Sequence, residues 1–184
     1  MRFIVLLLIC LAGVPGQARA QVSLFKADKL IVAVLQDDAG TIKDLLAHGH
    51  SPNVVDDRRR TSLILAAAAG NEEIVKILVE FRVKLDSRDS LGNTALLYAA
   101  EADHVAVIEI LLARGANPNI ENRRGTTPLI AAAGAGHVAA AGLLLDHKAD
   151  ATASDFTGRT ALTWARRNNR NGVVRLFSRR GIAD

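Results

Sequence analysis

Residues 127–140 read TPLIAAAGAGHVAA. The first two residues predict the start of a helix, because the Thr127 hydroxyl can accept a hydrogen bond from a free backbone N–H and Pro128 suits the first helical position. Farther on, Gly134 and Gly136 begin a GxGxxA spacing typical of a dinucleotide-binding turn, which must follow a β-strand. A capped helix precedes these glycines instead. We therefore interpret them as small residues that permit close packing at a junction between two helices.

Threonine recurs along the chain at a spacing of 33 residues. The members are Thr61, Thr94, Thr127 and Thr160, and one further step back is Asp28, another residue type that caps helices. Two more sets repeat in step, namely Leu30, Leu63, Leu96, Leu129 and Leu162, and Ala33, Ala66, Ala99, Ala132 and Ala165. A fixed period of this length is typical of repeat proteins, in which each unit buries its apolar face against its neighbours. We predict five units, which start at residues 28, 61, 94, 127 and 160.

Each unit has the pattern of a helical hairpin. A short helix rich in alanine follows the capping residue, and breaks in the chain come at Gly70, Asp103, Gly136 and Asn169. A second helix, with apolar residues at i, i+3 and i+4, then ends near Gly49, Gly115 and Gly181. Between the units, residues 89–92, 122–125 and 155–158 begin with Asp or Asn and end with Gly, as type I turns prefer. These features predict an all-α fold.

The chain resembles the ankyrin repeat family in period, element order and motif. Residues 127–133 meet the family's TPLHxAA pattern except for its histidine, residues 136–137 match its Gly-His pair, and residues 115–119 match Gly-Ala-Asx-x-Asn. Arg82 and Lys148 replace the glycine of this last motif in two other units. The resemblance implies an ankyrin-repeat solenoid of about five helix-turn-helix units joined by β-turn fingers.

Residues 1–20 have the anatomy of a secretory signal peptide. Arg2 precedes an apolar run over residues 3–14, and Ala18 and Ala20 form the small-x-small pattern before the cleavage point. A helix of twelve residues would reach only about 18 Å against a hydrocarbon core of about 30 Å, so we do not interpret the run as a membrane anchor. We predict a periplasmic or secreted protein with no membrane span after cleavage.

Cleavage would leave a lead at residues 21–27 and a repeat domain at residues 28–184. Cys10, the single cysteine, would be removed, so the mature protein would rely on its packed core rather than on disulfides. Two arginines would also be removed, which leaves 21 basic and 19 acidic residues, a net charge of +2. Six arginines against one acid at residues 160–184 make the C-terminal end basic.

No catalytic, cofactor or metal constellation is found in the sequence. The five histidines lack metal-binding context, and no G-x-S-x-G or cysteine nucleophile is present in the mature chain. His104 and His137 hold one repeat position, where we predict junction hydrogen bonds. Tyr98 and Trp164 share another position, which we interpret as core. We predict a protein that is not an enzyme and that has no cofactor.

The positions that stacking does not need are the turn tips and the exposed side of the first helices. In the ankyrin family, this face binds other proteins. Carried over by position, the predicted partner-binding residues are Asp57, Arg58, Arg60, Ser90, Leu91, Asn93, Glu101, Arg123, Arg124, Phe156, Arg159 and Arg167. Among them, we expect the tips at Arg58, Leu91, Arg124 and Phe156 to project in one row. Arginine and aromatic residues are frequent interface anchors, so we expect a partner with an acidic patch.

The favoured function is a monomeric, exported adaptor or stabiliser of a partner protein. Resemblance to small exported bacterial ankyrin proteins implies support of an envelope enzyme, such as one in oxidant defence. The alternative is a basic surface that binds a polyanion, either nucleic acid or anionic lipid. The low net charge and the lack of interleaved aromatic residues argue against that alternative and against specific nucleic-acid binding.

Overall fold

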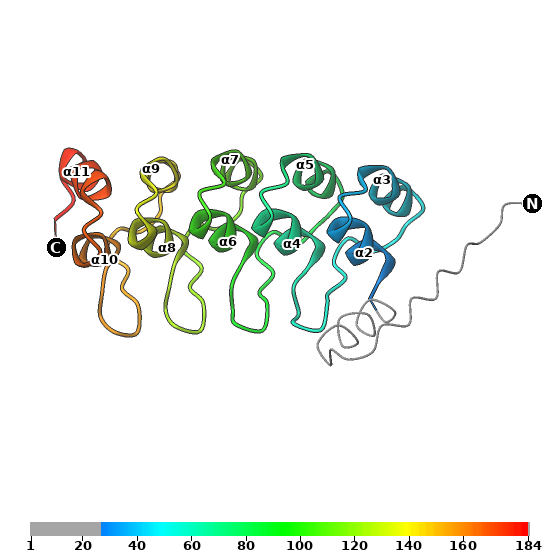
Figure 1. The fold of residues 1–184 in the computed structure, drawn as a ribbon, viewed down its shortest axis with the longest axis horizontal. Helices are drawn as coiled ribbons and strands as arrows, with labels where there is room; N and C mark the ends of the chain where they lie inside the picture. Colours follow the sequence, from blue (N-terminus) through cyan, green and yellow to red (C-terminus); the bar gives the residue numbers. More distant parts are fainter. Residues whose placement is uncertain (1–26, 184) are drawn as a thin grey trace, which may run out of the picture.

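A computed structural model describes residues 27–183 of the chain. The first helices of the units are α2 (Lys29–Leu35), α4 (Ser62–Ala68), α6 (Ala95–Glu101), α8 (Pro128–Ala135) and α10 (Ala161–Arg167). The second helices are α3 (Ala39–Ala47), α5 (Glu72–Glu80), α7 (Val105–Ala113), α9 (Val138–Asp146) and α11 (Asn171–Arg179). The two sets form parallel rows, and the connecting fingers project on the side of the first helices (Figure 1). The predicted all-α solenoid of ankyrin type is confirmed.

The predicted signal peptide at residues 1–20, with its cleavage residues Ala18 and Ala20, lies outside the described residues, as does the lead up to residue 26. Within residues 27–183, no helix has both the length and the apolar character needed to cross a membrane.

Every first helix begins at the predicted capping residue. Asp28 accepts a hydrogen bond from the backbone N–H of Leu30 at 2.8 Å. The threonine hydroxyls accept from the residue three positions on, at 3.1 to 3.3 Å, in α4, α6, α8 and α10. These side chains satisfy backbone donors that the first turn of a helix leaves without an intrahelical partner. The 33-residue spacing therefore repeats a helix start.

The junction between the two helices of a unit is left-handed in all five units. The residues are Asp37, Gly70, Asp103, Gly136 and Asn169, with φ values of 59°, 70°, 58°, 96° and 57°. Gly136 also has a steric reason, because a Cβ there would lie 2.8 Å from Cδ of Arg170. Close packing does not explain Gly134, since a Cβ there would meet nothing nearer than 3.7 Å. The packing interpretation is right for Gly136 and wrong for Gly134.

The predicted junction hydrogen bonds of the histidines are confirmed. Nε2 of His104 lies 3.3 Å from the carbonyl oxygen of Ala68, and Nε2 of His137 lies 3.1 Å from that of Glu101. In the last unit the same position is Arg170, whose Nε donates to Gly134. Each link crosses to the first helix of the preceding unit. These side chains therefore link neighbouring units to one another.

The core runs continuously along the solenoid between the two rows of helices. Successive first helices pack directly on each other, as do successive second helices. The leucine and alanine sets of the first helices, represented in the middle unit by Leu96 and Ala99, are all buried. Buried alanines let neighbouring helices approach closely, and the leucines fill the space toward the second row. This core fixes the register in which the fingers follow one another.

Replacing Leu96 with alanine should lower the free energy of unfolding by roughly 2 to 5 kcal/mol, because it removes a fully buried leucine from the middle of the solenoid. Urea melts followed by circular dichroism measure the change. The control is Leu91→Ala, at an exposed finger tip, which should change the free energy by less than about 0.5 kcal/mol. Equal effects of the two substitutions would contradict this packing.

Candidate functional site

The four fingers are β-turns of one design, as predicted for three of them. In each, the residue at the fourth position donates its backbone N–H to the carbonyl of the first, as Gly92 does to Asp89 at 3.0 Å. Oδ1 of the first residue also accepts two backbone N–H groups, which for Asp89 belong to Leu91 and Asn93, both at 2.8 Å. The equivalent residues are Asp56, Asn122 and Asp155. Each finger is therefore held by its own hydrogen bonds.

A ladder of backbone hydrogen bonds joins successive fingers. The N–H of Ser90 donates to the carbonyl of Arg58 at 2.9 Å, that of Arg123 to Leu91 at 3.1 Å, and that of Phe156 to Arg124 at 3.0 Å. Arg58, Leu91 and Arg124 thus share one repeat position. The expectation that Phe156 belongs to the same row is wrong, because Phe156 is equivalent to Ser90 and Arg123. The fingers nevertheless form one continuous surface.

The interpretation of Tyr98 and Trp164 as core is right only in part, since both rings pack against the core without being fully buried. Both are half-buried, and each fastens a first helix to its finger. The Tyr98 hydroxyl donates to Oδ2 of Asp89 at 2.7 Å, and Nε1 of Trp164 donates to Oδ2 of Asp155 at 2.7 Å. Burial raises the pKa of Tyr98, so the phenol stays protonated and able to donate. The position anchors the finger above each of these two helices.

Asp155 stays ionised under this anchor. Burial raises the pKa of the carboxyl group, but hydrogen bonds from Thr157, Arg159 and Trp164 outweigh it and lower the pKa to about 2. Both carboxylate oxygens accept hydrogen bonds from the protein itself. Asp155 is therefore a structural anion, with both of its oxygens already hydrogen-bonded within the protein.

Unit 4 starts at residue 127, and we count the finger that precedes each unit, here residues 122–125, as part of that unit. Unit 4 departs from the arrangement of its neighbours. Its residue at the anchoring position is Ala131, which has no donor and little volume. The first residue of its finger is Asn122 rather than an aspartate, and Nδ2 of Asn122 donates to Oδ1 of Asn93 in the preceding finger at 2.8 Å. The finger of unit 4 is thus tied sideways to its neighbour rather than down to its own helix. The space above Ala131 is left unfilled.

Eleven of the twelve predicted partner-binding residues are exposed or half-exposed. Leu91 and Phe156 leave 60% and 72% of their surface accessible. Asn93 is the exception at 6%, because its amide lies between two fingers and accepts from Asn122. The assignment of Asn93 to the partner-binding surface is therefore wrong. Arg60 is half-buried and pairs with Asp56 at 2.7 Å, so part of its charge is used within its own finger.

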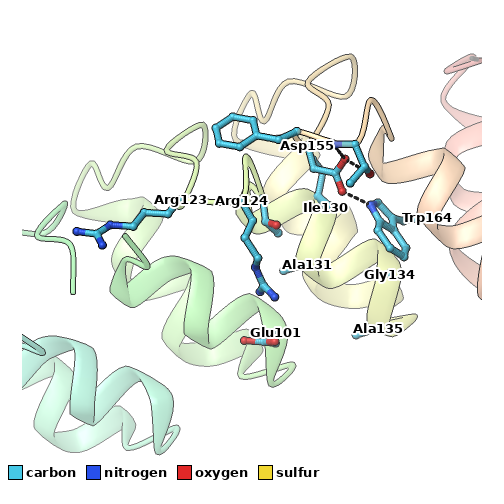
Figure 2. Close-up of a pocket in the computed structure, with 12 residues that line it drawn as sticks. Glu101, Arg123, Arg124, Ile130, Ala131, Gly134, Ala135, Asp155 and Trp164 are labelled. Atoms are coloured by element: carbon cyan, nitrogen blue, oxygen red, sulfur yellow. Dashed lines mark hydrogen bonds between the residues drawn. The ribbon is translucent and has the colours of Figure 1, made fainter. Parts of the chain in front are cut away.

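A hollow of about 570 Å³ lies between α8, α10 and the last two fingers. Its floor is formed by Ile130, Ala131, Gly134 and Ala135 of α8, and Trp164 stands at one side. Four predicted residues line it as well, namely Glu101, Arg123, Arg124 and Phe156. In Figure 2, Arg124 extends across the opening toward Glu101, whereas Arg123 points away from the floor.

Two further predicted residues, Arg159 and Arg167, lie at the edge of the hollow because they pack beside the Trp164 ring. The guanidinium of Arg159 lies 5.3 Å from the indole centroid and that of Arg167 lies 5.9 Å from it. Such distances allow cation–π attraction, which holds both arginines beside the ring. Six of the predicted residues therefore meet at this place, whereas Asp57, Arg58 and Arg60 lie on the finger of unit 2. Among residues 27–183, no group of histidine, cysteine or acidic side chains could hold a metal ion.

The sequence interpretation missed the residues that shape the hollow. Ala131 stands where the other fingered units have Leu65, Tyr98 and Trp164, and this contrast within an otherwise regular position was the available signal. The sequence interpretation takes Gly134 as a packing residue instead. The polar role of the aromatic residues could not be read from the repeat pattern, because their partners lie nine residues earlier in the fingers.

Replacing Asp155 with asparagine should destabilise the protein at pH 7 by on the order of 2 kcal/mol. The reason is that the side-chain NH₂ group would take the place of the oxygen that now accepts the hydrogen bond from Trp164. The folded pKa lies below the ordinary value, so this contribution is complete above about pH 4 and is lost as the pH falls toward about 2. Urea melts at pH 7, 4 and 3 should show the gap between wild type and variant narrowing. Asp57→Asn, at an exposed tip, is the control, and a gap that stays constant with pH would contradict the assignment.

Comparison with known families supports the same architecture. A family model described as ankyrin repeats, in three copies, matches residues 30–122 and, in a second overlapping match, residues 107–183. The two matches together cover almost all of the described solenoid. Ankyrin repeats are protein–protein interaction modules and are generally not enzymes. The chain belongs to the ankyrin repeat family.

Proposed function

We propose that this protein is an exported, monomeric adaptor or stabiliser that binds an acidic patch of a partner protein through its fingers and the adjoining face of its first helices. The observation that supports this most is the finger ladder. It holds exposed Leu91 and Phe156 together with several arginines on one surface whose backbone is fixed before binding. Preorganisation lowers the entropy lost on association.

The charge of this surface favours an acidic partner. The side chains of Arg58, Arg123 and Arg124 are exposed, and none makes an ion pair within residues 27–183. The finger carboxylates Asp89 and Asp155 are buried and accept internal hydrogen bonds, so they are not available to pair with these arginines. Exposed arginines steer an acidic partner during approach, and apolar anchors slow its release.

Export is proposed from the pattern in residues 1–20. A chain cleaved after Ala20 would have no cysteine and could fold in an oxidising compartment without mispaired disulfides. The periplasm or the cell exterior suits this composition. There the partner would be an envelope protein, such as an enzyme of oxidant defence that gains stability when bound.

Binding to a polyanion has less support. Of the C-terminal arginines, Arg180 pairs with Asp146 at 2.7 Å and Arg170 donates to the Gly134 carbonyl, so both are used within the fold. Arg167 lies beside the Trp164 ring. A polyanion site would show a steep fall of affinity with salt, which separates the two functions.

Substitution of the finger tips tests the proposed surface. A partner is first recovered by cross-linking pull-down from an envelope extract, and its affinity is then measured by calorimetry. Leu91→Ser with Phe156→Ser should weaken the complex by about 2 kcal/mol or more, about thirtyfold in Kd, with an almost unchanged melting temperature. Arg58→Glu with Arg124→Glu should mainly slow association, by an amount that shrinks as salt rises.

The matched control for charge is Lys43→Glu, which is exposed on α3 in the row of second helices. It makes the same change of charge as either single arginine substitution, but away from the fingers, and should leave the affinity within about twofold. Ala68→Glu, on the exposed side of α4, should impair binding because it lies on the proposed face. Neutral results for all the finger substitutions would place the interface elsewhere.

Export has its own test. Mass spectrometry of the protein isolated from its native host should give a chain that begins at Gln21, because Ala18 and Ala20 direct cleavage after residue 20. Fractionation should recover that chain from the periplasm or the medium. A chain with an intact N-terminal segment in the cytoplasm would refute export while leaving the binding surface untouched.

A further inference from the structure

The hollow in unit 4 lies where the neighbouring units have an aromatic side chain. In the units on either side, Tyr98 and Trp164 occupy the position that Ala131 holds here. The next exposed position of the helix is Glu101 in unit 3 and Arg167 in unit 5, but Gly134 in unit 4. Both side chains that would cover the face of α8 are therefore reduced to a methyl group and a hydrogen atom. The resulting floor is apolar and open beneath the fingers.

Gly134 has no structural requirement that accounts for it. It lies inside α8, its φ is not left-handed, and a Cβ would meet Trp164 Cβ at 3.7 Å and Asn168 Nδ2 at 3.8 Å, both ordinary contacts. A glycine inside a helix destabilises it by about 1 kcal/mol relative to alanine. The fold would accept alanine here, so helix packing does not require the glycine. Its effect is to leave the space above α8 open.

The charges around the hollow define the chemistry of its occupant. Arg123 and Arg124 line it, and Arg159 and Arg167 lie beside Trp164 at its edge. Two acids line the hollow, Glu101 and Asp155. The oxygens of Asp155 accept hydrogen bonds inside the protein, whereas Glu101 is exposed. The surroundings are therefore cationic, and the floor is apolar.

We propose that this hollow is an anchor site for one aromatic side chain of the partner protein, with a carboxylate of the adjacent residue directed to Arg124. The proposal rests on the function proposed above and specifies the partner segment. The ring takes the place that Tyr98 and Trp164 take in the neighbouring units and packs beside Trp164, where aromatic pairs are favourable. A volume of about 570 Å³ also has room for the backbone on both sides of the ring.

The test uses peptides as the probe. Octapeptides from a random phage-displayed library are selected on the purified protein, and the selected sequences are expected to contain Phe, Tyr or Trp next to Asp or Glu. Chosen peptides without tryptophan are then titrated. Trp164 is the single tryptophan of the chain and lines the hollow, so its fluorescence should report occupancy directly.

Two substitutions fill the hollow. Ala131→Tyr places in unit 4 the side chain found in unit 3, and it should weaken peptide binding at least tenfold while the circular dichroism melt stays cooperative. Gly134→Ala should raise the melting temperature and weaken binding about threefold or more. The matched control is Gly142→Ala, inside α9, where a Cβ would meet nothing nearer than Leu176 Cδ2 at 3.9 Å. It should raise the melting temperature without any change in affinity.

The carboxylate is tested by a pair of changes. Arg124→Glu should weaken the selected peptide strongly, but it should have little effect on the same peptide with its acidic residue replaced by the amide. Selection of peptides without the aromatic–acidic pair, or unchanged affinity in both Ala131→Tyr and Gly134→Ala, would overturn the anchor site. If the native complex depends on Leu91 and Arg58 but not on these two substitutions, the proposed function stands and the anchor site does not.

Discussion

Close packing between successive first helices is the constraint on which the rest of the molecule depends. Small residues such as Ala66, Ala99 and Ala132 are fully buried between neighbouring helices, and no unit can cover this surface by itself. The separation and the register of the units follow from that contact. Because the fingers leave the helix starts at a fixed place, the same register brings each finger within backbone hydrogen-bonding distance of the next. The continuous surface of the fingers is thus a consequence of the core.

This arrangement separates the residues that hold the fold from those that are free to vary. The finger carboxylates Asp89 and Asp155 and three of the four capping threonines are buried and internally bonded, whereas the tips at Leu91 and Phe156 extend into solvent from a backbone already fixed. Changes at the tips should therefore cost little stability. The anchoring position behind the fingers is intermediate, since Tyr98 and Trp164 both stabilise a finger and face the surface.

Much of the fold could be predicted from the sequence because its signals are local and repeat five times. Caps at Asp28 and the threonines, left-handed junctions such as Gly136, and the histidine links all depend on residue types at fixed spacing. The candidate site could not be predicted so fully, because it depends on contacts between units. Asn93 is buried where Asn122 reaches it from the next finger, and the hollow lies where Trp164 stands beside an alanine and a glycine. The predicted row of finger tips is wrong at Phe156, which lies one residue before the position equivalent to Arg58, Leu91 and Arg124.

Unit 4 shows how a repeat protein can acquire a recess without a new element of structure. Its helix has the most complete family motif and the only proline at a first helical position among the described helices, which favours a well-formed α8. On the core side of α8, the buried residues Leu129 and Ala132 keep the regular packing. On its exposed side, the small residues Ala131 and Gly134 leave space unfilled. The finger above compensates for its lost anchor through the sideways amide bond of Asn122. Removing two side chains from a regular surface, rather than adding any, is therefore sufficient to create a recess bordered by arginines at a defined point of the solenoid.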